Sequence, residues 1–564
     1  MAAITEQIYS NEYKDYILPY SDSDVINQYK NYGVQLLDTH YMILHDRGDI
    51  PLFPIQSTAG LYNEYPYVPK VFTTLSTVSL ENSGIIQVQI QPNLNLTGKN
   101  TLIGFIDTGI DYTHPAFIDI NGETKIVSIW DQTIDTDATN SPFQYGTVYN
   151  SRQINQALGA SNPLAIVPTT DENGHGTALA GIAAGFSDPV NDFTGAAPEA
   201  KICAVKLKPA KPYLYDYYFA DPNIDIYQEN DIMTAIRFLI TQAALYQMPL
   251  IICLGLGTNQ GDHDGNSPLS QMITYLSYSS YTAFAIACGN EGNQAHHTYQ
   301  TITELYKETE ILVPDNCPGF TAELWGSTNA LFSIGFQTPL GTQIDPISIR
   351  PGQTAVIPFV LEKTRIEISY SIVTESGGNQ LAAFRFSNPT PGNWIIRVYN
   401  RNTSNASFHM WLPITGLLSK NVTFFNPDPD TTITIPSDSQ NGISTTFYNG
   451  YDQRFAINSS RGYTRSGMIK PNLATPGFNL TAPAPSSTYA LFSGSSGAAA
   501  LLAGSVALLQ QWRMDMTIPG IFDAAILSGY LSRGAVRENQ LNYPNRLWGY
   551  GKLNVYDIFT SLMS

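Results

Sequence analysis

The chain has 564 residues, of which 43% are hydrophobic and only 13% are charged. This much apolar material can bury a core, which excludes the intrinsically disordered and fibrous classes. The net charge of −18 gives an acidic surface that repels phosphate backbones and anionic lipids, so neither nucleic acid nor a membrane is an expected partner. Four cysteines are too few for a disulfide scaffold, and three of them lie in apolar runs typical of buried thiols.

The first 80 residues are rich in tyrosine and carry short apolar runs between turn residues, a pattern that predicts a small α+β domain. They show neither the basic n-region nor the apolar h-region of a signal peptide. No apolar run in the chain reaches the roughly 18 residues that a membrane-spanning helix needs. We therefore expect an intracellular protein without a signal peptide.

Residues 101–300 alternate short apolar runs with helical runs of small residues, for example TLIGFID, GIAAGF and AKICAVKL. This alternation predicts a parallel sheet covered by helices on both faces. Between about residues 303 and 425 the runs become rich in β-branched and aromatic residues, as in NWIIRVYN, and an inserted antiparallel sandwich is expected. The α/β pattern returns after about residue 430 and includes the small-residue helix SGAAALLAGSVALLQQW.

Two polar side chains stand at the ends of predicted strands. Asp107 ends the run LIGFID, so it should project from the carboxyl edge of the sheet, where the sites of open α/β folds gather. Asn290 follows the run AFAIAC and a glycine, and its amide is a neutral donor suited to a developing oxyanion. When each motif is taken alone, a helix cap or a turn remains the alternative.

Two further reactive side chains lie at predicted helix starts. His175 stands between two glycines and opens a helix of very small residues. Its imidazole suits proton transfer near neutral pH, with a metal ligand or a helix cap as alternatives. Ser496, in FSGSSGAAA, lies in the first turn of the long helix, where backbone N–H groups lack helical partners. Taken alone, it is more typical of an N-cap serine.

Together these residues occur in the order Asp, His, Asn, Ser, and the order Asp, His, Ser is that of subtilisin. The segments IDTGID, GHGTALAG, GAAPEAKICAVKL, ACGNEG, KPNLATPG and GSSGAAA resemble the subtilisin-like serine peptidases over about residues 101–300 and 430–555. A closer resemblance, to the clostridial spore-germination subtilases called Csp proteins, rests on LNLTGKNTLIGFIDTGIDYTHPAF, LGTNQGDHDG, SSRGYTRSGMIKPNLATPG and the inserted sandwich.

The resemblance implies a role for each of the four motif residues: orienting acid Asp107, general base His175, nucleophile Ser496 and oxyanion donor Asn290. Two positions depart from the family pattern. Ser495 stands where threonine is usual before the nucleophile, and Ala500 replaces a proline after it. Both replacements are small, so we expect the geometry to survive.

The resemblance also implies a substrate-binding surface. An exposed strand edge would pair with the substrate backbone, reading main chain rather than sequence; its residues are Leu254, Gly255, Leu256 and Gly257. The walls at Ala287 and Gly289 would shape the pocket for the residue before the cut. The alternative is that these glycines only end a buried strand.

The implied fold is a subtilisin-like parallel sheet flanked by helices, with an N-terminal α+β prodomain and an inserted antiparallel β jelly roll. Four segments follow: a prodomain at residues 1–80, a first catalytic part at 81–302, the jelly roll at 303–425 and a second catalytic part at 426–564. The prodomain would assist folding, be cut off by the enzyme itself within about residues 70–85, and stay bound.

The implied function is that of a serine endopeptidase that processes its own prodomain and activates a precursor cortex-lytic enzyme during spore germination. A weak or inactive pseudoprotease that acts by binding, and a general intracellular peptidase, are the alternatives. The expected partners are protein or peptide substrates and the cleaved prodomain, with a location inside the cell and in the spore.

No cofactor is expected from the sequence. Subtilases often bind structural Ca²⁺, but no loop here shows the alternating Asp and Asn ligands that would allow such an ion to be assigned. His296 and His297 are expected in a solvated polar loop rather than at a metal site.

Overall fold

The computed structural model describes most of the chain after residue 80 and three strands before it. The described residues are 14–19, 29, 33–36, 41–46, 80, 82–134, 145–210, 212–227, 229–326, 332–347, 353–359, 362–373, 379–400, 406–517 and 522–563. They fall into two compact units, Met1–Thr74 and Leu75–Ser564. Among the described helices, none combines the length and hydropathy needed to cross a membrane.

The first unit contains a three-stranded antiparallel sheet. Its strands, in spatial order, are β1 (Lys14–Pro19), β3 (Tyr41–Asp46) and β2 (Gly33–Leu36). Met42 and Leu44 of β3 are buried. The helical part of the expected α+β prodomain, and most of the predicted cleavage window at residues 70–85, lie outside the described residues.

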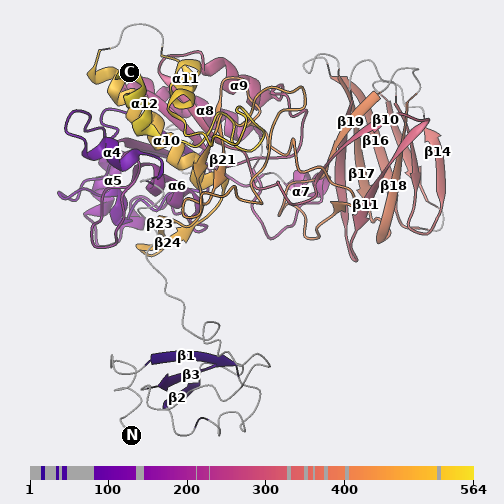
Figure 1. Ribbon diagram of the computed structural model, residues 1–564, viewed down its shortest axis with the longest axis horizontal. Coiled ribbons are helices and arrows are strands. Elements are labelled where there is room, and N and C mark those ends of the chain that lie inside the picture. Colours follow the sequence, from indigo (N-terminus) through magenta and orange to yellow (C-terminus); the bar gives the residue numbers. More distant parts are fainter. Residues whose placement is uncertain are drawn as a thin grey trace. The chain divides into compact units, whose positions relative to one another are not determined.

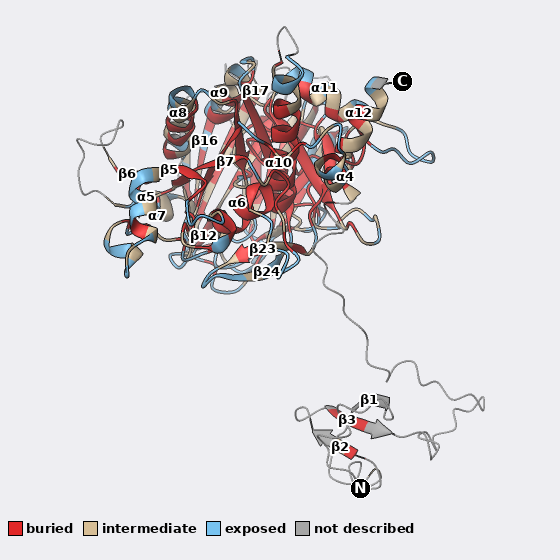
Figure 2. Cartoon of the chain, turned by 90° about the vertical axis from the view of Figure 1, so that its left-hand side faces the viewer, coloured by how far each residue is buried: buried red, intermediate tan, exposed pale blue. Residues whose placement is uncertain are grey.

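An eight-stranded sheet forms the centre of the second unit (Figures 1 and 2). Its strands, in spatial order, are β22 (Leu473–Pro476), β21 (Ile443–Tyr448), β9 (Thr282–Ala287), β8 (Leu250–Leu254), β4 (Leu102–Asp107), β7 (Lys201–Lys206), β5 (Ile126–Asp131) and β6 (Thr147–Asn150). All neighbours run parallel except β5 and β6. Strands β4, β8 and β9 are buried along their whole length, which is why they read as unbroken apolar runs.

Helices cover both faces of this sheet, which confirms the predicted α/β fold (Figure 2). One hydrophobic core lies under α4 (Ile85–Ile90), α5 (Ser151–Leu158), α6 (His175–Ala184), α10 (Ser495–Asp515), α11 (Ala524–Gly534) and α12 (Val555–Met563). A second core lies under α8 (Glu229–Tyr246) and α9 (Pro268–Leu276). Helices α6 and α10 pack against each other, and their small residues allow this close approach.

Two antiparallel sheets face each other over residues 297–424, a segment called the sandwich below. The first contains β10 (His297–Ile302), β19 (Ala406–Trp411), β12 (Gly319–Gly326), β17 (Asn379–Ser387), β16 (Arg365–Val373) and β15 (Gln353–Pro358). The second contains β14 (Gln343–Ile347), β13 (Phe332–Gln337), β18 (Gly392–Asn400), β11 (Tyr306–Val313) and β20 (Thr423–Phe424). Their inner faces share one hydrophobic core. Because β10 pairs with β19, the sandwich begins ahead of residue 303.

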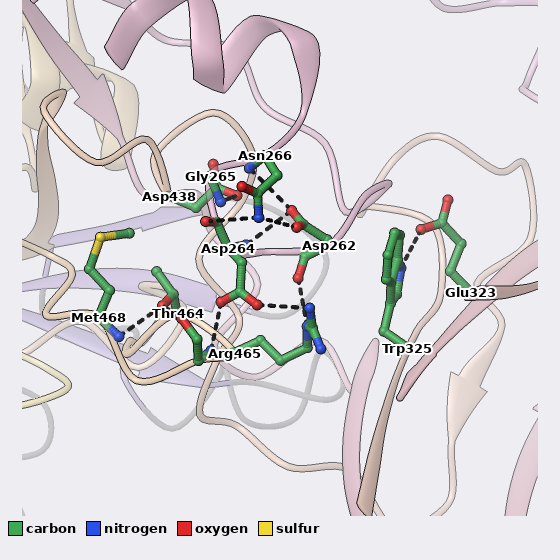
Figure 3. A network of polar contacts seen from close by, with 11 residues as sticks. Asp262, Asp264, Gly265, Asn266, Glu323, Trp325, Asp438, Thr464, Arg465 and Met468 are labelled. Atoms are coloured by element: carbon green, nitrogen blue, oxygen red, sulfur yellow. Dashed lines mark hydrogen bonds and ion pairs between the residues drawn. The ribbon is translucent and has the colours of Figure 1, made fainter. Parts of the chain in front are cut away.

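A polar network attaches the sandwich to the α/β part (Figure 3). The Arg465 guanidinium forms an ion pair with Asp264 at 2.8 Å and lies over the ring of Trp325, a residue of β12. The neighbouring Glu323, also on β12, accepts hydrogen bonds through Oε2 from Trp325 Nε1 at 2.9 Å and from Gly261 N at 2.8 Å. Asp264 and Arg465 are thus paired with each other at this junction, and Glu323 is held by hydrogen bonds from neutral donors.

The expectation that His296 and His297 lie in a solvated loop is wrong. Their side chains are buried, with exposures of 3% and 1%. His297 stacks on Trp411 at 4.8 Å between ring centroids, and its Nε2 lies 2.9 Å from Nδ1 of His409. The polar sequence around the histidines gave no sign of this, because the partners of His297, namely His409, Trp411 and Asp428, are more than 100 residues further along the chain.

The paired rings of His297 and His409 predict a loss of stability in acid. Burial lowers the pKa of His297 to about 3 and that of His409 well below its usual value. His297 Nδ1 donates to Asp428 O, so its Nε2 must accept the proton of His409 Nδ1, and both rings are neutral. In the unfolded chain the same rings take up protons below about pH 6.5. The folded state is therefore destabilised as the pH falls, by roughly 2 kcal/mol for His297 at pH 5.

Thermal unfolding of the wild type and of His297→Gln at pH 7 and pH 5 measures how much stability the buried His297 removes as the pH falls. The variant should lose less stability between the two pH values, whatever its stability at pH 7. Comparing the two pH dependences removes the contributions of other groups such as Asp438, whose pKa burial raises to about 7. Equal pH dependences would contradict the prediction.

Candidate active site

Asp107 is the last residue of β4, and its side chain is only 2% exposed. Its Oδ1 accepts hydrogen bonds from His175 Nδ1 at 2.7 Å and from Thr108 N at 2.8 Å. Among the described residues, no group donates to its Oδ2. The carboxylate thus faces the imidazole from the carboxyl edge of the sheet, as the strand pattern predicted.

His175 is the first residue of α6, and the local sequence brings this helix start against the Asp107 loop. A β-carbon at Gly176 would collide with Gly109 O, so only glycine allows this approach. Asp171 fixes the first turn, because its Oδ1 accepts from Gly174 N and its Oδ2 from Thr177 N, both at 2.9 Å. We did not predict Asp171 from the sequence, although an acidic residue shortly before a helix start is a capping signal.

The environment of His175 favours its protonated form. Burial acts to lower the pKa of the imidazole, but the charge and hydrogen bond of Asp107, together with the charge of Asp171, outweigh burial and raise it above the usual value. The ring can therefore take up a proton and hold it. The Phe492 ring, 5.5 Å from the imidazole between centroids, covers it and is a second contact absent from our predictions.

Ser496 is the second residue of α10 and is 8% exposed. Its Oγ donates to Gly255 O at 3.0 Å. A β-carbon built on Gly255 would lie 3.2 Å from both Ser496 Cβ and His175 Cε1, so these side chains flank the same glycine. A side chain at Gly255 would crowd both of these residues and Leu179. Ser495 and Ala500, the two departures from the family pattern, are buried within a continuous helix.

Asn290 lies beyond the end of β9, after Gly289, whose φ of +96° makes the turn that glycine permits. Its Oδ1 accepts a hydrogen bond from Ser495 N at 3.1 Å, which places the carboxamide beside the first turn of α10. The backbone N–H groups of that turn have no partners within the helix. The structure thus brings together the four motif residues from two strand ends and two helix starts.

The segment of Gly255, Leu256 and Gly257 continues β8 without a strand neighbour among the described residues. Leu254, the last residue of β8, is buried, whereas Gly257 is exposed. Ala287 is buried at the end of β9. The predicted substrate-binding residues therefore flank one open edge next to Ser496.

Thr434 is a further residue at this edge that our sequence analysis missed. A β-carbon added at Gly257 or at Gly289 would collide with its side chain, so Thr434 fills the space between the two glycine segments. Thr434 N and Oγ1 both donate to Cys288 O, at 2.9 and 3.2 Å, and hold the side chain there. The space between Gly257 and Gly289 is consequently small.

Among the described residues, no group of three or more His, Cys, Asp or Glu side chains could hold a metal ion. Asp262 accepts a hydrogen bond from Asn266 Nδ2, and Asp264 forms an ion pair with Arg465 (Figure 3). The Arg465 guanidinium supplies the positive charge beside Asp264.

Comparisons with known proteins point to one family. The Subtilase family profile matches residues 98–308 and 372–551. The solved structure of the Clostridium perfringens CspB protease is 28% identical, covers 86% of this chain and 97% of its own, and superposes with a TM-score of 0.77. The PI-type proteinase of Lactococcus lactis subsp. cremoris is 21% identical over 74% of this chain, and thermitase of Thermoactinomyces vulgaris is 28% identical over 35%. These matches span only 23% and 50% of the two relatives' lengths.

Proposed function

The chain belongs to the subtilase family of subtilisin-like serine peptidases, and we propose that it hydrolyses peptide bonds through an acyl-enzyme on Ser496. The observation that carries the proposal is the 2.7 Å hydrogen bond between His175 Nδ1 and Asp107 Oδ1, next to a serine in the first turn of a helix. In a subtilase, such a pair activates the serine as a nucleophile.

In the proposed reaction, the Ser496 hydroxyl turns about its Cα–Cβ bond from Gly255 O to His175 Nε2 and attacks the scissile carbonyl. The imidazole takes the hydroxyl proton, and Asp107 stabilises the resulting cation. Asn290 Nδ2 and Ser496 N–H hold the oxyanion. The imidazole then protonates the leaving amine, and water attacks the acyl-enzyme with His175 again acting as base.

The substrate backbone is proposed to add as a strand to residues 254–257, with the side chain before the cut between Gly257 and Gly289. Edge pairing reads the main chain, so side-chain selection falls to the pocket walls. We also propose that the enzyme releases its N-terminal segment by self-cleavage, that this prodomain stays bound, and that a precursor cortex-lytic hydrolase of the spore is its target.

Two alternatives are tested together with this proposal. A pseudoprotease would leave fluorescently labelled casein intact, whereas a general peptidase would degrade casein as readily as a precursor cortex-lytic hydrolase. The proposed function predicts casein cleavage that a fluorophosphonate abolishes, and faster, limited cleavage of the precursor. The retained acid, base and serine favour catalysis over binding alone.

Replacing Asn290 with alanine should lower kcat by about 10² to 10³, with little change in KM, because the amide donates to the oxyanion only in the transition state. Steady-state peptide hydrolysis measures both constants. Asn293→Ala, in the same loop and exposed, is the matched control and should behave as the wild type. A kcat of Asn290→Ala close to the wild-type value would rule out this role.

Thr434 predicts a preference for small residues before the cut. Peptides with Gly, Ala or Ser at that position should be cleaved well, and those with Leu or Phe poorly. Thr434→Gly should raise kcat/KM for the large residues by about 10-fold or more, since each methylene that a pocket accepts or rejects has an effect of this size. If the wild type already prefers Phe, the side chain does not limit this pocket.

A further inference from the structure

A buried carboxylate next to the proposed oxyanion donor has no role in the steps above. Glu291 follows Asn290 directly in the chain, and its side chain is 3% exposed. A carboxylate buried to this extent requires hydrogen bonds to both of its oxygens. The question is which parts of the molecule supply them.

Three donors converge on this carboxylate. His296 Nδ1 donates to Oε2 at 2.7 Å, and Asn259 Nδ2 donates to the same oxygen at 3.0 Å. Thr415 N donates to Oε1 at 3.1 Å. Burial acts to raise the pKa of Glu291, but the hydrogen bonds and charge of His296 lead the opposing effects, and the pKa lies below its usual value. The side chain is therefore an anion held from several directions.

These donors come from the substrate-binding edge and from the sandwich. Asn259 lies two residues beyond Gly257, and its Nδ2 also donates to Leu412 O at 3.2 Å. His296 directly precedes β10, and its Nε2 lies 2.8 Å from Asn421 Oδ1. Thr415, like Leu412 and Asn421, belongs to the connection between β19 and β20. The carboxylate thus links the Asn290 loop to the sandwich.

Within the described part of the chain, the Asn290 side chain forms one hydrogen bond, which its Oδ1 accepts from Ser495 N. The backbone on either side is anchored, because Ser460 Oγ accepts from Glu291 N at 2.9 Å and Gly289 O accepts from Ser460 N at 3.1 Å. The orientation of the Asn290 amide consequently depends on how firmly the next residue is held.

We propose that Glu291 is a positioning residue, which fixes Asn290 for oxyanion stabilisation by tying its loop to His296, Asn259 and Thr415. Through these bonds, the sandwich completes the oxyanion hole rather than serving only as an appended domain. The inference rests on the proposed function, because it assigns Asn290 as the donor. An oxyanion donor that is displaced by about 1 Å loses much of its effect.

The test compares Glu291→Gln with Glu323→Gln in the full-length protein. Both glutamates lie where the sandwich meets the α/β part; Glu291 is buried and Glu323 is half-buried, and desolvation raises the pKa of Glu323. Both donors to Glu323 use Oε2, so the single oxygen of glutamine can replace it. The donors to Glu291 use both oxygens, so glutamine cannot. Glu291→Gln should lower kcat about 10-fold or more with KM near the wild-type value, whereas Glu323→Gln should leave both unchanged.

A double-mutant cycle with Asn290→Ala separates positioning from general loosening. In the Asn290→Ala background, Glu291→Gln should cause no further loss of kcat, because the group on which it acts is gone. Asn421→Ala, an exposed site that leaves the core intact, should lower kcat a few-fold in the wild-type background only. The Asn421→Ala variant provides the same test if Glu291→Gln does not fold.

Three results would overturn the inference. A wild-type kcat for Glu291→Gln, with Asn290→Ala impaired, would remove the positioning role and leave the proposed oxyanion donor intact. An equal loss of kcat in both backgrounds would show that Glu291 does not act through Asn290. If Asn290→Ala itself had the wild-type kcat, the oxyanion assignment in the proposed function would fail, and the inference with it.

Discussion

Replacing Ser496 with alanine should lower kcat for peptide hydrolysis by about six powers of ten, to the residual rate that binding and the oxyanion hole provide without a nucleophile. The same variant should keep its N-terminal segment, because self-cleavage needs the same hydroxyl. Peptide assays and the size of the purified chain measure the two effects. The fold should be preserved, since the variant loses one hydrogen bond among the described residues, from the hydroxyl to Gly255 O.

The matched control is Ser493→Ala, three residues away and exposed, which should be processed and active as the wild type. Adding active wild-type protein to Ser496→Ala tests whether processing can also occur between molecules. If Ser496→Ala were clipped at the same site without any added enzyme, the cleavage would not be self-processing. If it retained peptidase activity, Ser496 would not be the nucleophile.

Replacing Asp107 with asparagine should lower kcat by about 10⁴, because the amide cannot stabilise the imidazolium or fix the required tautomer. The pH dependence of kcat/KM should change as well. His175 acts as a base only when neutral, so activity falls as the pH drops through its pKa, which Asp107 holds above the usual value of about 6.5. Without that charge, burial lowers the pKa, and the acid limb should move to lower pH.

The control for Asp107→Asn is Asp111→Asn, in the same loop, whose carboxylate bonds Thr113 rather than the imidazole. Its pH profile should match that of the wild type. An acid limb that stays in place in Asp107→Asn would mean that the carboxylate does not set the pKa of His175.

The α/β fold could be predicted because its signals are local. Strands such as β4 and β8 are buried on both faces, so they read as unbroken apolar runs. The small residues of α6 and α10 show in the sequence that these helices pack closely. Candidate site residues could be named because each stands at a strand end or a helix start, where the carboxyl edge of a parallel sheet brings such ends together.

The contacts around the site could not be predicted in this way, because each depends on segments far apart in the chain. Thr434 fills the space between Gly257 and Gly289, although 145 residues separate it from the nearer glycine and 177 from the other. His296 has a polar sequence environment, yet it is buried, and its Nε2 lies 2.8 Å from Oδ1 of Asn421, 125 residues further along the chain. Neither periodicity nor composition carries information about such partners, so the loop was wrongly predicted to be solvated.

The central claim is that His175 and Asp107 activate Ser496. It is tested most directly by treating the native protein with a fluorophosphonate probe and mapping the labelled residue by mass spectrometry. The account predicts labelling of Ser496 alone, lost on heat denaturation and in His175→Ala. A folded wild-type protein that does not react, or a His175→Ala variant that reacts as fast as the wild type, would contradict it.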